Sequence, residues 1–89
     1  MAAFQLAKFE NETVLIDGNE YKACDFRNCR VVYKGGPGPA FAQCHFSDCE
    51  WVFEDAALRT LRFLQAAYHG MGAGGRQLVA QTFENIQRA

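Results

Sequence analysis

The four cysteines are the first residues whose type and spacing suggest chemistry. They form two pairs, each with four intervening residues, which invites a comparison with zinc sites. Structural zinc ligands are usually separated by two to four residues, and the glycines of a zinc knuckle are absent here. We interpret the thiols as reduced, small core residues, with a metal site or a disulfide as the alternatives. We expect no cofactor and no metal for these residues: Cys24, Cys29, Cys44 and Cys49.

The two histidines do not indicate catalysis. His45 and Asp25 occupy equivalent positions of a repeat described below, and the few serine-type hydroxyls near either histidine do not sit in a nucleophile motif. A histidine-carboxylate pair without a nucleophile or metal is an ordinary surface contact. His69 ends a predicted helix, where a cation interacts favourably with the helix dipole. We therefore expect a protein that is not an enzyme.

The glycine-rich segment after His69 is the most suggestive binding feature. Glycines before a helix expose backbone N–H groups at the positive end of its dipole, and an arginine adds a fixed charge. The spacing matches neither a P-loop nor a dinucleotide fingerprint. One hypothesis is an anion site with an aromatic ring for a base, and the alternative is a flexible interhelical turn. The hypothetical ligand-binding residues are Gly72, Gly74, Gly75, Arg76, His69 and Trp51.

A repeat positions most of these residues. Residues 21–33 align without gaps on residues 41–53, at an offset of 20. Large apolar residues recur every five positions, and smaller residues often precede them by two. Four sides of five residues would return the chain to its start after 20, as in a stacked architecture. The large residues are Ile16, Tyr21, Phe26, Val31, Phe41, Phe46 and Trp51; the row two positions earlier begins Val14, Asn19, Cys24, Cys29.

In this pattern the chain resembles the pentapeptide-repeat proteins over about 40 of its 89 residues. That family places Leu or Phe at the centre of each five-residue unit and Ala, Cys or Ser two positions earlier, both facing inward. The resemblance implies a right-handed quadrilateral β-helix. The segment 34–39, which is rich in Gly and Pro, would form one irregular side. The matching pairs are Cys24/Phe26, Cys29/Val31, Cys44/Phe46 and Cys49/Trp51.

The C-terminal third has helical spacing instead. Asp55 is a suitable N-cap for a helix over 55–69, and a second helix is predicted over 75–88. Two helices after the last coil would cover the open end of a solenoid. We therefore predict a single domain, 1–89, that is mainly β with α. It would be a short right-handed β-solenoid of about two coils at 14–53, with a five-residue register, capped by two C-terminal helices.

Composition limits the partners. Nine basic and ten acidic residues give a net charge of −1 with no basic run, which argues against direct nucleic-acid binding. No apolar run is long enough for a membrane, and no signal peptide is evident, so we expect a cytoplasmic protein. Eight Phe in so short a chain favour a homo-oligomer. The hypothetical interface residues are Tyr33, Phe53 and Phe63, and Val32 and Val52 could join them in an exposed apolar strip.

Our leading functional hypothesis is therefore a non-enzymatic binding module, a small self-associating solenoid that holds a protein or ligand. An alternative is sequestration of a small anionic or nucleotide signal molecule at a subunit interface. A second alternative follows only from the family resemblance: inhibition of a DNA-handling enzyme.

Overall fold

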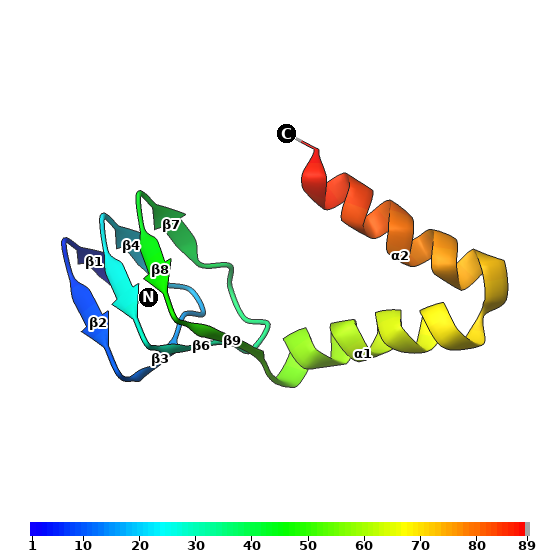
Figure 1. The fold of residues 1–89 in the computed structure, drawn as a ribbon, viewed down its shortest axis with the longest axis horizontal. Coiled ribbons are helices and arrows are strands. Elements are labelled where there is room, and N and C mark those ends of the chain that lie inside the picture. The colour runs from blue at the N-terminus through cyan, green and yellow to red at the C-terminus, as the bar shows by residue number, and fades with distance from the viewer. Residues whose placement is uncertain (89) are drawn as a thin grey trace. The chain divides into compact units, whose positions relative to one another are not determined.

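The structure is a computed structural model, and it describes residues 1–88. Nine short strands precede two helices (Figure 1). Neither helix has the length and hydropathy needed to span a membrane. The strands are β1 (Ala3–Gln5), β2 (Lys8–Glu10), β3 (Thr13–Leu15), β4 (Glu20–Lys22), β5 (Asp25–Arg27), β6 (Arg30–Tyr33), β7 (Ala40–Ala42), β8 (His45–Ser47) and β9 (Glu50–Phe53); the helices are α1 (Asp55–Gly70) and α2 (Gly72–Gln87).

The strands form three parallel sheets, each of three strands. The sheets are β1-β4-β7, β2-β5-β8 and β3-β6-β9. The chain therefore visits the three sheets in turn and then returns to the first (Figure 1). We call β1–β3 layer 1, β4–β6 layer 2 and β7–β9 layer 3. The prediction of a mainly β chain with two C-terminal helices is confirmed.

Layers 2 and 3 have the register that the repeat predicted. Tyr21 is opposite Phe41, Phe26 is opposite Phe46, and every other aligned pair within these strands follows the same 20-residue offset. The segment 34–39 contains no strand and forms the connection between the layers.

Layer 1 was not predicted, and it corrects both the extent and the number of layers. The strands begin at Ala3 rather than at residue 14. The strand unit therefore has three layers instead of the predicted two or so, and each sheet has one strand from each layer. Val14 is opposite Val31, which places it among the large central residues and not in the row two positions earlier. The physical reason is a short connection. Residues 16–19 bring Tyr21 opposite Phe4 after 17 residues, an offset that a 20-residue comparison cannot detect.

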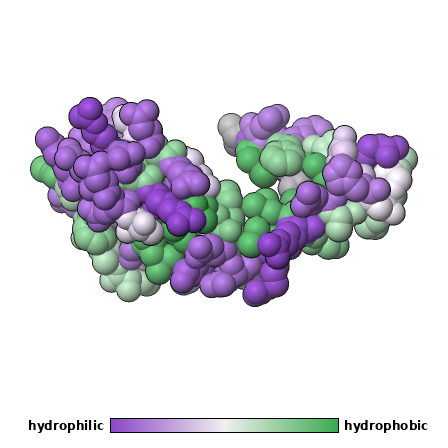
Figure 2. Space-filling model, turned by 60° about the horizontal axis from the view of Figure 1, so that its bottom comes forward, coloured by the Kyte–Doolittle hydropathy of each residue, from purple (hydrophilic) through white to green (hydrophobic). Residues whose placement is uncertain are grey.

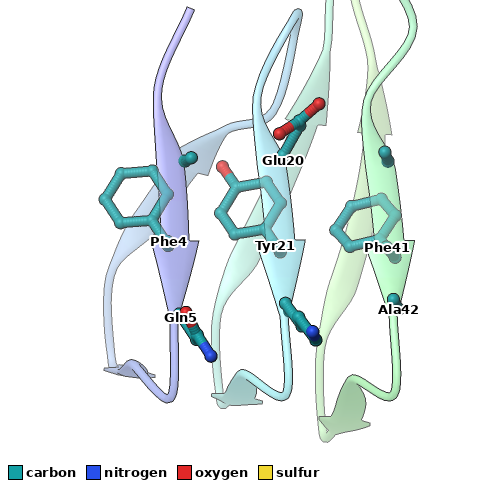
Figure 3. Close-up of a pocket in the computed structure, with 9 residues that line it drawn as sticks. Phe4, Gln5, Glu20, Tyr21, Phe41 and Ala42 are labelled. Carbon is teal, nitrogen blue, oxygen red and sulfur yellow. The ribbon is translucent and has the colours of Figure 1, made fainter.

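Aromatic rings stacked between layers fill the interior. Phe4, Tyr21 and Phe41 are stacked with successive centroids 5.2 Å apart, as Figure 3 shows on β1, β4 and β7. A second stack, Phe9–Phe26–Phe46, has a spacing of 4.8 Å. Such rings bury large apolar areas, so the two columns account for much of the core.

Tyr21 is the polar member of this core. Its ring is almost fully buried, and its hydroxyl accepts a hydrogen bond from Asn19 Nδ2 at 3.1 Å. Burial raises the pKa of the Tyr21 phenol above its usual 10.0, because the charged form loses hydration. The hydroxyl is therefore kept neutral and acts as part of the packing.

Left-handed residues form the corners between strands. Six non-glycine residues between consecutive strands have φ between 52° and 55°. Asn and Asp tolerate this conformation better than most residues. Asn28 also donates from Nδ2 to Asn11 Oδ1 at 2.6 Å, which links the corners of adjacent layers. The six corner residues are Leu6, Asn11, Ala23, Asn28, Gln43 and Asp48.

The irregular connection 34–39 is fixed by hydrogen bonds. The Asp17 carboxylate accepts from the N–H groups of Lys34 and Gly36 at 2.9 and 2.7 Å. The Tyr33 hydroxyl donates to the Gly36 carbonyl at 2.8 Å. The Gly18 N–H also donates to the Pro37 carbonyl at 2.7 Å. These bonds hold a segment whose sequence predicts no regular structure.

The chain divides into two compact units, Met1–Leu58 and the helical part from Arg59 onward. In the helical part, Met71 alone separates α1 from α2. The second helix begins at Gly72 instead of the predicted residue 75, because the glycine-rich segment forms its first turn rather than a loop.

Candidate functional site

The glycines predicted to bind an anion have different roles in the structure. Gly72, Gly74 and Gly75 all lie in the first turn of α2, followed by Arg76. A Cβ on Gly75 would overlap the Ala67 carbonyl of α1, and both Gly75 and Ala67 are buried. Gly75 is thus needed for the close approach of the two helices. A Cβ on Gly74 would meet nothing within 4 Å, and Gly72 has a φ of 61°.

The other two predicted ligand residues lie in different parts of the chain. His69 is in the last turn of α1, where its ring makes an edge contact with Tyr68 at 5.2 Å. Trp51 is in β9, with its ring 4.9 Å from that of Phe46 and 48% of the residue exposed. Trp51 belongs to the first compact unit and His69 to the second. An anion site with Trp51 as its base platform therefore remains a hypothesis.

The cysteines occupy the inner corners of the strand layers. Cys24 and Cys29 are buried, as predicted, and Cys44 and Cys49 in layer 3 are half-buried. The Sγ atom of Cys29 lies 3.2 Å from the carbonyl oxygen of Phe9, one layer earlier, and the other three thiols make similar contacts. These contacts give the cysteines a packing role. Within residues 1–88, no three side chains of His, Cys, Asp or Glu gather as metal ligands would.

His45 and Asp25 are register neighbours on β8 and β5, as the alignment predicted. They help to line a shallow hollow of about 240 Å³ on the outer side of the sheet β2-β5-β8. The charged residues of this hollow alternate in sign from layer to layer: Lys8 is beside Asp25, and Glu10 is beside Arg27. A larger hollow, of about 410 Å³, lies along the sheet β1-β4-β7 (Figure 3).

The three hypothetical interface residues differ in exposure. Phe53 and Phe63 are 42% and 58% exposed, whereas Tyr33 is half-buried and tied to Gly36. Val32 is only 5% exposed, so the predicted apolar strip beside Tyr33 is not continuous. Val32 lies in the middle layer, between Leu15 and Val52. The interface assignment of Tyr33, Phe53 and Phe63 stays a prediction.

Comparisons with known proteins identify no relative. No protein-family model matches the chain, and neither the curated proteins nor the solved structures include a match.

The residues that sequence reasoning missed are those of layer 1. Phe4, Phe9 and Val14 follow one another at intervals of five, and Ala2 and Ala7 precede the two phenylalanines by two positions. This is the same pattern as in the later layers. It could have been found by extending the five-residue interval toward the N-terminus instead of requiring a 20-residue offset.

Proposed function

We propose that this chain is a non-enzymatic binding module that self-associates and acts by holding a protein or ligand. The strand unit is proposed to be a short right-handed β-solenoid of the pentapeptide-repeat type, followed in the chain by the two helices. The in-register ring stacks and the inward cysteines support that proposal, since they match the central and preceding positions of the five-residue unit. The protein is further proposed to act in the cytoplasm.

Self-association is supported by the amount of exposed apolar side chain. Thirteen large apolar residues of the described chain are at least 36% exposed, in a protein of 10.0 kDa. Figure 2 shows hydrophobic residues reaching the surface among hydrophilic ones. Burial of such side chains against a second molecule is favourable, because it removes apolar surface from water. This exposure is the observation that carries the proposal.

The experiment is a molar mass measured by sedimentation equilibrium across micromolar concentrations. We expect a mass at least twice that of the single chain, falling toward it on dilution. A mass equal to that of one chain at every concentration would overturn self-association.

The alternative function, sequestration of an anionic or nucleotide signal molecule, is supported by one feature of α2. Its first turn contains no acidic residue, and Arg76 follows the glycines directly. Thermal stabilisation by a panel of nucleotides, lost in Arg76→Ala, would favour this alternative. The second alternative, inhibition of a DNA-handling enzyme, rests on the family resemblance alone.

A further inference from the structure

Layer 1 presents an open edge at the N-terminal end of the strand unit. In layer 2, Asp25 donates its N–H to the Ala7 carbonyl at 3.0 Å, and so reaches toward layer 1. Lys8 is the register partner of Asp25, and none of the described strands lies beyond it. Alternate residues of a strand direct their N–H and C=O groups to the same side. Lys8 and Glu10 therefore both direct these groups away from the stack.

The shape of this edge restricts its occupant. Layer 1 consists of three strands of three residues each, on three different sides of the stack. One three-residue strand is shorter than the usual strand and offers few hydrogen bonds to an extended peptide. An occupant that pairs with all three edges at once must itself have three short strands, joined by corners within one layer. A second copy of this chain does so.

We propose that layer 1 is a homodimer interface, in which two copies meet end to end about a two-fold axis through β2. This inference rests on the proposed self-association and names its surface. The axis reverses β2, so β2 pairs antiparallel with β2 of the second copy. It also exchanges the flanking sides, so β1 pairs with β3 of the second copy and β3 with its β1. Such a contact is closed, as most homodimer contacts are, and leaves no open edge at this end.

The sequence of β2 is self-complementary under that axis. Its three residues are Lys8, Phe9 and Glu10. Antiparallel pairing centred on Phe9 places Lys8 opposite Glu10 of the second copy, and Glu10 opposite its Lys8. These pairs exchange both backbone hydrogen bonds, and their side chains have opposite charge. The two Phe9 residues form the closer, non-hydrogen-bonded pair on the axis.

The neighbouring layers extend this complementarity. Within one copy Lys8 lies beside Asp25, and Glu10 lies beside Arg27. The dimer contact adds an acidic neighbour on the other side of Lys8 and a basic one on the other side of Glu10. Charge therefore alternates without interruption across the interface, an arrangement that favours this register over a slipped one.

The flanking strands introduce no charge conflict. β1 against β3 of the second copy places Ala3 opposite Leu15, Phe4 opposite Val14 and Gln5 opposite Thr13. None of these pairs carries like charges, and two of the three are apolar. Leu15 is 48% exposed in the single chain, so the contact would cover it.

The other end of the stack lacks this signature. The same operation on layer 3 would place His45 opposite Ser47 of the second copy, with no pair of opposite charges on β8. The chain also continues from β9 into α1 after a single residue, Glu54. These features of layer 3 favour layer 1 as the interface.

Charge exchange tests the proposal on the full chain. Lys8→Glu makes both outer positions of β2 acidic, and Glu10→Lys makes both basic, so each variant opposes like charges twice. We expect each to weaken the homodimer by at least about tenfold in dissociation constant. An equimolar mixture of the two variants should form a heterodimer in native mass spectrometry. The double variant Lys8→Glu/Glu10→Lys should associate more tightly than either single variant, since it again opposes unlike charges across the interface. It should stay weaker than wild type, because it places like charges beside Asp25 and Arg27 within each copy.

Lys22→Glu is the matched control, since it makes the same charge change at an exposed position of the middle layer. Circular dichroism confirms that every variant is folded. If wild type dimerises but Lys8→Glu weakens it no more than Lys22→Glu, or the mixture yields no heterodimer, the layer 1 interface is wrong while self-association stands. If wild type is monomeric, both proposals are wrong.

Discussion

Gly75 shows how a single missing atom decides the packing of two helices. The residue is buried, and a Cβ at this position would overlap the Ala67 carbonyl of α1. Gly74, in the same turn, has open space instead. Of these two adjacent glycines, Gly74 therefore has room for a side chain and Gly75 does not.

The prediction is a divergent response to the same substitution. Gly75→Ala should destabilise the helical part by about 1–3 kcal/mol, because overpacking forces the helices apart. Gly74→Ala should leave its stability unchanged or raise it by up to about 1 kcal/mol, since Ala is the better helix former. Urea denaturation followed by far-UV circular dichroism measures both. Equal effects in the two variants would contradict the packing role.

This pair also shows why the candidate site was only partly predictable. The sequence identifies a glycine-rich helix start with Arg76, and the structure has one there. The sequence does not distinguish a glycine that a ligand requires from a glycine that a neighbouring helix requires, because in both cases the requirement is the absence of a Cβ. Only the contact with Ala67 distinguishes Gly75, and that contact depends on how α1 and α2 pack.

At the scale of elements, layer 1 contains both core and exposed apolar residues. Phe4 belongs to the core through its stack on Tyr21 at 5.2 Å and its edge contact with Phe9 at 5.4 Å. Leu6, two residues later, is 75% exposed at a corner. The two apolar residues should therefore contribute unequally to stability.

We expect Phe4→Ala to lower the free energy of unfolding by about 2 kcal/mol, less than for a fully buried ring because Phe4 is half-buried. Leu6→Ala should change it by less than about 0.5 kcal/mol. Chemical denaturation at one fixed protein concentration compares the two. Similar small effects for both substitutions would show that layer 1 does not pack on the core.

The predictability of the strands followed the length of the connections. Tyr21 and Phe41 were matched correctly because the chain between them contains the full 20 residues that four five-residue sides require. Phe4 was missed because residues 16–19 make a shorter return, which shifts the offset to 17. Side-chain pattern thus predicts what faces inward, whereas the return path, held by Asp17 and Asn19, sets the register.

At the scale of the whole molecule, the net charge of −1 conceals two units of opposite charge. Residues 1–58 contain nine acidic and five basic residues, whereas residues 59–88 contain one acidic and four basic residues. The net charge of the whole chain, which is near zero, argues against nucleic-acid binding for the chain as a whole but does not describe each unit separately. The proposed layer 1 contact joins two strand units of the same net charge, so it depends on the local pairing of Lys8 with Glu10 and not on the net charge of either unit.

Composition predicted association but not its surface. Exposed rings such as Phe63 and Phe83 suggested a general tendency to associate, while the proposed contact depends on Lys8 and Glu10. Their complementarity becomes visible only after β2 is known to be a terminal strand. The element order therefore had to be known before the surface could be named.

The most direct test is amide hydrogen exchange at Lys8 and Glu10, measured by NMR across the concentrations at which the protein associates. The account predicts slow exchange at both amides in the dimer and fast exchange on dilution, since their N–H groups bond only to the second copy. The amide of Asp25, bonded to Ala7 within one chain, should stay protected at every concentration. Fast exchange at Lys8 and Glu10 in a sample of dimeric mass would contradict the account.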